Sequence, residues 1–217
     1  MTDHILKNNT RFNRRTALLI AAFVLAAAGT WVYKSFYYDF VPKRFGVVEE
    51  GYIYRSGQLS APLVKKILSD RKIRVIVDLT NDDTANPDQQ AEKKAADELN
   101  IKMSRFPLGG KGTGDVNQYA RAIIAIADAR KNNLPVLVHC AAGTQRTGGV
   151  IAMFRLLVQK KEPAFAVSEM KRYGWNAKDN PVLLPYLNDN MATLAEMLKQ
   201  AGIIDEIPNP LPRLPLN

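Results

Sequence analysis

The sequence predicts an α/β fold with a central, mostly parallel sheet flanked by helices and preceded by one N-terminal transmembrane helix. From residue 47 onward, short Ile, Val and Leu runs alternate with longer segments of helical periodicity, which is typical of parallel strands covered on both faces. The run 136–140 is followed within a few residues by an apolar helical pattern, as in strand–turn–helix units. The uncharged apolar stretch 17–32 precedes these elements and predicts the membrane helix.

Residues 1–38 are expected to form a membrane anchor or a signal peptide. Aromatic residues follow the uncharged segment Ala17–Val32 and suit the interface between membrane and water. Three basic residues follow this segment before residue 45, and four precede it: Lys7, Arg11, Arg14 and Arg15. This asymmetry favours a cytoplasmic N-terminus, with the remainder of the chain in the periplasm or outside the cell. Ala26-Ala27-Ala28 also fits a signal-peptidase site, so export after cleavage is the alternative.

Length and charge narrow the possible function classes. The 217 residues fit one soluble domain plus an appendage. Residues 1–44 carry seven Lys or Arg against two Asp, or +5 of the total +9, so the domain itself is only mildly basic. The sequence has no basic stripe interleaved with aromatic residues, which argues against nucleic-acid binding, whereas a mild positive charge suits an anionic substrate. The single cysteine excludes an intrachain disulfide.

The first half of the expected domain alternates strands and helices. Val47–Arg55 has the composition of a strand. Ser60 is expected to cap a helix that begins at Ala61-Pro62. Ile73–Leu79 is a continuous apolar run, as expected of a strand buried on both faces. An amphipathic helix at 88–99 and a strand at 101–108 complete this half.

The second half follows the same alternation. Its expected elements are a helix at 116–131, a strand at 136–140, and helices at 148–159, 164–173 and 181–202. The domain is therefore expected at 47–204, with a linker at 39–46 before it and a proline-rich tail at 205–217 after it. Pro212-Arg213-Leu214-Pro215 matches a PxxP ligand, but an ordered tail is the preferred interpretation.

The junction of the 136–140 strand with the next helix carries the chemistry. Cys140, the only cysteine, ends the strand, and five residues separate it from Arg146 at the start of the helical pattern. The first turn of a helix has unpaired N–H groups and a dipole that favours negative charge, so the loop is suited to bind an anion. The same field stabilises a thiolate, which predicts a Cys140 pKa below the usual value of about 8.5.

These residue types fit nucleophilic attack by a thiolate on phosphorus. The backbone N–H groups of the loop would hold the phosphate while the Arg146 guanidinium binds two of its oxygens. Thr147 can donate its hydroxyl to the thiolate, and His139 is expected to hydrogen-bond nearby backbone and so fix the loop. The expected phosphate-binding positions are Ala141, Ala142, Gly143, Thr144, Gln145 and Arg146. The reaction needs neither a metal nor a cofactor.

The segment His139-Cys140-(five residues)-Arg146-Thr147-Gly148 matches the signature His-Cys-x5-Arg-Ser/Thr-Gly. At these residues the chain resembles the cysteine-dependent protein tyrosine phosphatase superfamily. Tyr54-Arg55-Ser56-Gly57-Gln58 is similar to a motif of its compact bacterial and atypical dual-specificity members. The resemblance covers roughly residues 46–202 and implies a dual-specificity phosphatase-like fold, a cysteinyl-phosphate intermediate, and a phosphoprotein or small phosphomonoester substrate. With the anchor, it implies a single-pass protein of the bacterial inner membrane with a periplasmic catalytic domain.

The general acid is less well defined by the sequence. In the similar families an aspartate on a loop before the nucleophile donates a proton to the leaving group. Asp115 is the candidate here, at the end of the glycine-rich loop 109–114, although it also suits the N-cap of the following helix. Asp82 and Asp83 are alternatives. Lys111 is followed by Gly112 rather than Ser or Thr, so the glycine-rich loop is not a Walker A motif.

Functions besides that of a protein phosphatase remain open. Anchoring to a membrane also suits a phospholipid or inositol phosphate phosphatase, although the uncharged positions of the loop give no positive reason for highly phosphorylated substrates. The sequence also fits an inactive phosphate-binding module, or a rhodanese-like sulfur transferase, whose loop is typically one residue shorter. Arg55 either supports the phosphate loop or substrate, or forms a surface ion pair.

Overall fold

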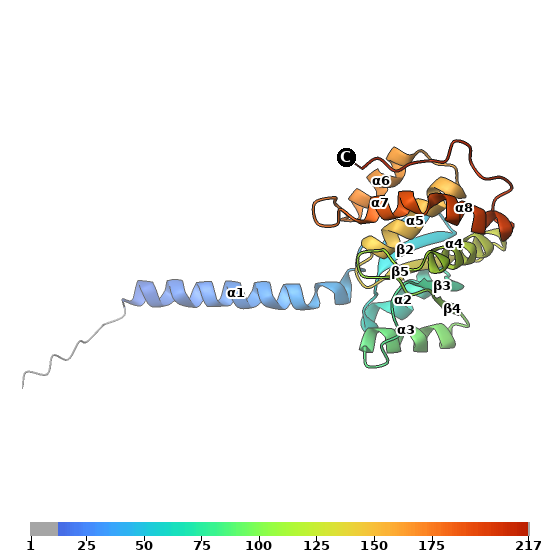
Figure 1. Cartoon of the computed structure of the whole chain (residues 1–217). Helices are drawn as coiled ribbons and strands as arrows, with labels where there is room; N and C mark the ends of the chain where they lie inside the picture. Colours follow the sequence, from blue (N-terminus) through green and yellow to red (C-terminus); the bar gives the residue numbers. More distant parts are fainter. Residues whose placement is uncertain (1–12, 217) are drawn as a thin grey trace, which may run out of the picture. The chain divides into compact units, whose positions relative to one another are not determined.

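The computed structural model describes residues 13–216, and Figure 1 shows the order of their helices and strands. The chain forms two compact units, residues 1–38 and 39–217. The linker at 39–46 and the proline-rich tail therefore belong to the same unit as the strands and helices between them. Lys7 and Arg11, which contributed to the predicted orientation, lie outside the described residues, as does Asn217 at the end of the tail.

Helix α1 (Arg14–Phe40) makes up most of the described part of the first unit. Its segment Thr16–Tyr33 is long and apolar enough to cross a membrane, and within residues 13–216 it is the one helical segment of this kind. The predicted apolar stretch 17–32 lies inside it. A signal sequence has the same length and composition, so the anchor and the signal peptide remain alternatives.

The second unit is built on one five-stranded sheet in the order β1-β2-β5-β3-β4. Its strands are β1 (Gly46–Glu49), β2 (Ile53–Gly57), β3 (Val75–Asp78), β4 (Lys102–Arg105) and β5 (Val136–Cys140). Only β1 and β2 pair antiparallel, and every other neighbouring pair is parallel. The predicted mostly parallel sheet is thus confirmed, with β5 at its centre.

One predicted strand is in fact a hairpin. The sequence predicted a single strand at 47–55, whereas the chain turns between β1 and β2 and returns antiparallel. Gly51 lies in this turn with φ +79°, a backbone conformation that glycine adopts without strain. Val47-Val48 and Tyr52-Ile53-Tyr54 both have the composition of a strand, and Glu49-Glu50-Gly51 lie between them.

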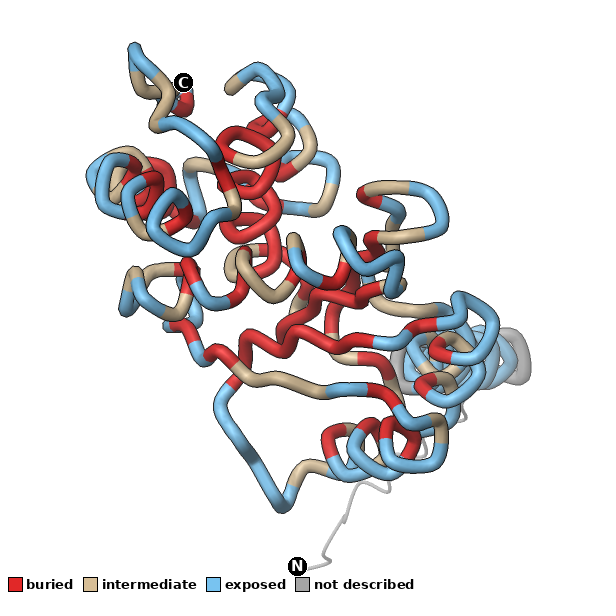
Figure 2. The backbone as a smooth tube through the Cα atoms, turned by 90° about the vertical axis from the view of Figure 1, so that its right-hand side faces the viewer, coloured by how far each residue is buried: buried red, intermediate tan, exposed pale blue. Residues whose placement is uncertain are grey.

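Helices cover both faces of the sheet (Figure 1). On one face, α2 (Ala61–Asp70) and α3 (Pro87–Glu98) pack over an apolar cluster that includes Ile76 and Leu137. On the other face, α4 (Val116–Lys131) and α5 (Gln145–Leu157) pack on the central strands. Helix α6 (Pro163–Arg172) packs on α5. Figure 2 shows the buried residues concentrated in the sheet and in the helix behind it. The core is therefore thickest around β5.

The C-terminal part differs from expectation at one point. The predicted helix 181–202 is divided into α7 (Leu183–Asp189) and α8 (Met191–Gln200). Asn190 leaves helical geometry with φ −97° and ψ 4°, and its side chain donates to the Tyr186 carbonyl, which competes with the regular helical pattern. The two short helices still present their leucines to the core.

The proline-rich tail packs on the domain. Leu214 is 2% exposed, and the Asn188 side chain both donates to its carbonyl (2.9 Å) and accepts from its N–H (2.8 Å). This contact occupies the middle of the PxxP segment. The interpretation of the segment as an ordered tail is confirmed for the described residues up to 216.

Candidate active site

Strand β5 and helix α5 are joined by the short loop 141–144. Because β5 lies between β2 and β3, Cys140 stands at the carboxyl edge in the middle of the sheet, where α/β proteins commonly bind ligands. Helix α5 begins at Gln145, three residues before the predicted Gly148. Arg146 and Thr147 consequently lie in the first helical turn, where backbone N–H groups have no partner within the helix.

The carbonyl groups of the loop are held from outside. Those of residues 141, 142 and 143 accept hydrogen bonds from the Gln58 N–H (3.2 Å), Arg44 (3.0 Å) and Arg55 (2.8 Å), respectively. In a trans peptide the C=O and the following N–H point in opposite directions. Carbonyls fixed on the outside therefore turn the N–H groups of the loop inward, toward Cys140. This is the geometry that an anion-binding loop requires.

Cys140 lies at the bottom of this loop and is 1% exposed. The Gly143 N–H donates to its sulfur over 3.2 Å. Burial by itself raises the pKa of the Cys140 thiol, but the Thr147 hydroxyl and N–H, the Arg146 charge and the Gly143 N–H act against it, and the net pKa lies below the ordinary value. The predicted direction of the shift is confirmed, and it increases the share of the thiolate, which is the nucleophilic form of the side chain.

Arg55 is the main support of the loop that the sequence left undecided. Its side chain is fully buried, donates to the Gly143 carbonyl and stacks 3.8 Å from the centre of the Tyr173 ring. Burial lowers the pKa of Arg55 to about 10, so the guanidinium remains charged at neutral pH. The interpretation as a surface ion pair is wrong. The hydrogen bond from Arg55 to the Gly143 carbonyl agrees instead with a role in supporting the phosphate loop.

Gly143 is expected to tolerate no side chain. Its φ is +76°, and a Cβ there would lie 2.5 Å from the backbone nitrogen of Gly57. Gly143→Ala should displace the loop and lower kcat/KM by about 100-fold, as misplacements on the order of 1 Å do in active sites. The measurement is hydrolysis of an aryl phosphate.

Gly51→Ala is the matched control, because Gly51 has φ +79° but open space where a Cβ would stand. It should cost stability without changing kcat/KM. Equal kcat/KM values of the two variants would show that the close approach of Gly143 to β2 has no effect on catalysis.

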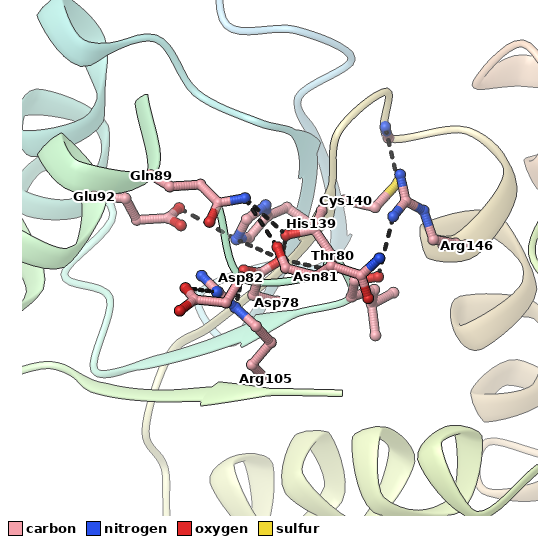
Figure 3. Close-up of polar contacts among 12 residues, drawn as sticks. Asp78, Thr80, Asn81, Asp82, Gln89, Glu92, Arg105, His139, Cys140 and Arg146 are labelled. Atoms are coloured by element: carbon pink, nitrogen blue, oxygen red, sulfur yellow. Dashed lines mark hydrogen bonds and ion pairs between the residues drawn. The ribbon is translucent and has the colours of Figure 1, made fainter. Parts of the chain in front are cut away.

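Arg146 and Thr147, also predicted to be catalytic, both lie near the Cys140 sulfur. Figure 3 shows the Arg146 guanidinium beside Cys140. One of its nitrogens donates to the Leu79 carbonyl (3.3 Å), which ties the side chain to the end of β3 and leaves its other N–H groups for a ligand. The Thr147 hydroxyl is fully buried and has no oxygen or nitrogen partner, so the Cys140 sulfur is the group that it serves.

His139 is placed differently from the prediction. Its ring makes no hydrogen bond to nearby backbone, but lies with Nε2 3.2 Å from Glu92 and 3.9 Å from Asp78, and all three side chains are fully buried (Figure 3). Asp78 also accepts from Thr80 and from Arg105 (2.8 Å). Asp78 thus pairs with Arg105, and the contact of Glu92 with His139 is an ion pair when the imidazole is protonated.

Sequence reasoning missed Glu92 because a glutamate in an amphipathic helix normally faces solvent. The signal was the spacing of the buried residues of α3: Gln89, Glu92, Ala95 and Ala96. This spacing is that of one helical face, and it places Glu92 on the buried face of α3.

The candidate acids occupy separate positions. Asp115 is the N-cap of α4, and its carboxylate accepts from the N–H (2.9 Å) and the side-chain amide (2.7 Å) of Asn117. Asp82, by contrast, pairs with Arg105, and Asp83 accepts from the Ala85 N–H. The N-cap position of Asp115 is confirmed, and its role as an acid stays a prediction.

The loop that leads to Asp115 is fixed against the phosphate loop. The buried Asn180 amide donates to the Lys111 carbonyl and to the Gln145 side chain, both over 2.8 Å. A Cβ at Gly112 would lie 3.0 Å from the Gln145 carbonyl. These contacts bring the glycine-rich loop 109–114 beside the start of α5. The hydroxyl of Thr144, the residue before Gln145, bonds to the Tyr173 carbonyl (3.3 Å) on the far side of the loop.

This fold and this site together define a cysteine-dependent phosphatase of the protein tyrosine phosphatase superfamily. The family model described as DSP-PTPase phosphatase fused to NAD+ kinase matches residues 43–181. The chain belongs to this family.

Curated relatives are similar over part of their length. Dual specificity protein phosphatase OPG106 of vaccinia virus is 32% identical over 95 residues, which are 43% of this chain and 49% of the viral protein. Dual specificity protein phosphatase TpbA of Pseudomonas aeruginosa is 25% identical over 128 residues (59% of this chain, 54% of TpbA). Inositol diphosphatase DSP2 of rice is 33% identical over 120 residues (54% and 55%). The chain spans about half the length of the curated relatives it matches.

Solved structures show the same fold. The crystal structure of P. aeruginosa TpbA has a TM-score of 0.57 at 22% identity and covers 71% of this chain and 89% of its own. The catalytic domain of the PP-IP phosphatase Siw14 from Saccharomyces cerevisiae, in complex with citrate, has a TM-score of 0.59 at 20% identity (79% and 97%).

Proposed function

We propose that the protein hydrolyses phosphomonoesters of phosphoproteins, with phosphotyrosine among its substrates, through a cysteinyl-phosphate intermediate. The observation that carries this proposal is the loop before α5: the carbonyls of residues 141–143 are bound from outside, while the Gly143 N–H, Thr147 and Arg146 lower the pKa of the Cys140 thiol. Such a loop stabilises the charge that develops on the oxygens of a transferring phosphoryl group.

The reaction has two steps. The Cys140 thiolate attacks phosphorus, and the bond to the ester oxygen breaks as Asp115 gives that oxygen a proton. Water then attacks the phosphocysteine and returns a proton to the Asp115 carboxylate, and phosphate and the thiolate are released. Thr147 stabilises the departing sulfur through its hydroxyl, while Arg146 and the loop N–H groups hold the phosphoryl oxygens throughout.

Phosphoprotein is favoured as the substrate because the loop positions 141, 142, 144 and 145 carry no charge. Two relatives are named dual specificity protein phosphatases, and a TpbA variant was crystallised with pTyr. An inositol phosphate is the second candidate. The exposed Arg44 bonds to the Ala142 carbonyl and adds a positive charge at the rim of the loop, and rice and Arabidopsis relatives are named inositol diphosphatases.

A substrate panel tests this function. The full chain is purified in detergent and assayed on a phosphotyrosine peptide, a phosphoserine peptide, an inositol phosphate and a phospholipid monoester. The highest kcat/KM is expected on the phosphotyrosine peptide. A higher value on the inositol phosphate or the lipid would replace the proposed substrate, and phosphate release by Cys140→Ser at a rate close to that of the wild type would contradict catalysis by Cys140. An inactive phosphate-binding module would turn over none of them.

Asp115→Asn tests the proposed acid. Asparagine is as good an N-cap as aspartate, so helix α4 should remain intact. We expect kcat on an alkyl phosphate to fall by about 10²- to 10³-fold, because that leaving group needs a proton. An activated aryl phosphate should lose far less. Asp82→Asn and Asp83→Asn are the controls, and equal losses on both substrates for Asp115→Asn would remove Asp115 from this role.

The proposed location follows from α1. Thr16–Tyr33 would anchor the protein in the bacterial inner membrane by a single pass, with the catalytic domain in the periplasm. Export after signal cleavage is the alternative, and either route exposes the domain to the same compartment. A lone cysteine suits an oxidising compartment because no second thiol of the chain can trap it in a disulfide.

A further inference from the structure

Two tyrosine hydroxyls hold the glycine-rich loop 109–114, which leads to the proposed acid. Tyr119 of α4 donates to the Gly112 carbonyl, and Tyr186 of α7 donates to the Gly114 carbonyl over 2.8 Å. The centres of the two rings are 5.9 Å apart, so the two side chains also pack against each other. Four of the six loop residues are glycines, whose backbone has little conformational preference of its own. The hydroxyls therefore fix a loop that its sequence alone leaves free.

The hydrogen bond from Tyr186 acts on the peptide group that joins Gly114 to Asp115. A peptide group is planar, so a bond to its carbonyl also restricts the direction of the following N–H and of the Asp115 Cα atom. Gly114 has φ +145°, a conformation that glycine adopts without strain, and it would let this peptide rotate if the carbonyl were unbound. The orientation of Asp115 therefore depends on Tyr186.

The Asp115 carboxylate keeps one oxygen for a substrate. Both of its hydrogen bonds, from the N–H and the side-chain amide of Asn117, go to Oδ1. Oδ2 accepts no hydrogen bond from residues 13–216, and Asp115 is exposed. The contact with Asn117 fixes the carboxylate relative to α4, whereas Tyr186 fixes the peptide group on the other side of the residue. Together they determine where Oδ2 points.

Tyr186 is suited to this contact by its position in α7. Leu183, Leu184 and Leu187 of the same helix are buried in the core and hold the helix in place. Burial first, and the charge of Asp115 second, raise the pKa of the Tyr186 hydroxyl. The hydroxyl therefore keeps its proton at neutral pH and remains a hydrogen-bond donor to the loop.

We propose that Tyr186 is a positioning residue for the acid step of the reaction: its hydroxyl holds the peptide before Asp115, so that Oδ2 faces the leaving-group oxygen of the substrate. The proposal rests on the proposed function, because it concerns the proton that Asp115 gives to the ester oxygen as the bond to phosphorus breaks. Tyr186 itself transfers no proton. Its effect is confined to substrates whose leaving group needs one.

The test is Tyr186→Phe in the full chain, which removes one oxygen atom and retains the ring beside Tyr119. On an alkyl phosphate, kcat should fall about tenfold, because a misdirected carboxylate transfers its proton less effectively. On an activated aryl phosphate, whose leaving group needs no proton, kcat should change by less than about twofold. A general loss of folded protein would lower both rates alike. Equal changes on the two substrates, or no change on either, would overturn the proposal.

Tyr52→Phe is the matched control. Tyr52 is also partly buried, but it precedes β2 at the end of the sheet away from Cys140, where its ring lies 3.8 Å from the Arg130 guanidinium. Its replacement should leave kcat on both substrates within about twofold of the wild type, as a hydroxyl remote from the site should. A tenfold loss confined to the alkyl phosphate in this variant would overturn the assignment to Tyr186.

A double variant shows whether Tyr186 acts through Asp115. In an Asp115→Asn background, Tyr186→Phe should cause no further loss on the alkyl phosphate, because the group that it positions is already removed. A further loss would overturn the proposal. A loss by Tyr186→Phe alone as large as that by Asp115→Asn would indicate that the tyrosine is itself the proton donor, and this too would overturn its positioning role.

Failure of this proposal is distinguishable from failure of the proposed function. A wild-type chain that hydrolyses neither substrate would overturn the function and the acid step with it. An active wild type in which Tyr186→Phe changes both substrates equally would retain the function and remove only the role of Tyr186.

Discussion

Cys140→Ser should reduce kcat by about four orders of magnitude or more, as loss of a nucleophile does in other covalent enzymes. A serine hydroxyl keeps the shape of the site but does not ionise near neutral pH, so it needs a base to remove its proton. The structure offers none within the loop, because the one neighbouring imidazole, His139, is buried on the opposite side of the sheet with Glu92. The measurement is kcat on an aryl phosphate and on a phosphotyrosine peptide.

The variant should still bind its substrate. The N–H groups of the loop are held by contacts that do not involve the sulfur, namely those of Arg44, Arg55 and Gln58. A thermal melting curve close to that of the wild type and retained binding of a phosphotyrosine peptide are the controls. Residual turnover above about one per cent, which corresponds to a loss of less than about 3 kcal/mol in the barrier, would contradict covalent catalysis by Cys140.

Arg146→Lys should lower kcat/KM by about 10³-fold, which is the scale of a transition-state arginine in phosphoryl transfer. Lysine preserves the positive charge but lacks the planar fork that binds two phosphoryl oxygens at once. It also lacks the geometry by which Arg146 bonds to the Leu79 carbonyl while facing the loop. The loss should fall mainly on kcat, because the second oxygen contact strengthens as charge develops in the transition state.

Arg130→Lys provides the matched control. Arg130 forms an ion pair with Glu49 at the opposite end of the domain's helix α4, away from the loop. Its replacement should leave kcat/KM within a factor of about two, since partly exposed ion pairs contribute about 1 kcal/mol or less. If Arg146→Lys behaved like this control, the guanidinium would not be a ligand of the phosphoryl group.

The part of the site that could be predicted is the part encoded in consecutive residues. Cys140, Arg146 and Thr147 belong to one strand–loop–helix segment, so their spacing alone determines that they meet. The sheet was predictable for a similar reason, because each buried parallel strand is a short apolar run. The hairpin turn at Gly51 and the break at Asn190 were missed because residues of the same structural preference stand on both sides of each.

The residues that could not be assigned act across long stretches of chain. Arg55 contacts Gly143 from another strand, and Glu92 contacts His139 from a helix on the opposite face. Neither pairing leaves a local pattern, because a buried arginine and a surface arginine read alike in a sequence. The N-cap position of Asp115 depends on neighbouring residues in the sequence and was predictable. Its distance from a leaving group depends on the folded chain and was not.

The outward-held carbonyls of the loop have a consequence for turnover. Three residues, Arg44, Arg55 and Gln58, fix the peptide groups before any phosphate arrives, so the loop does not distinguish a phosphate still attached to its ester from one already released. Inorganic phosphate presents the same tetrahedral oxygens to the same N–H groups. Accumulating phosphate therefore competes with the substrate for Arg146 and the loop. The rigidity of the site thus limits the rate of hydrolysis once product has accumulated.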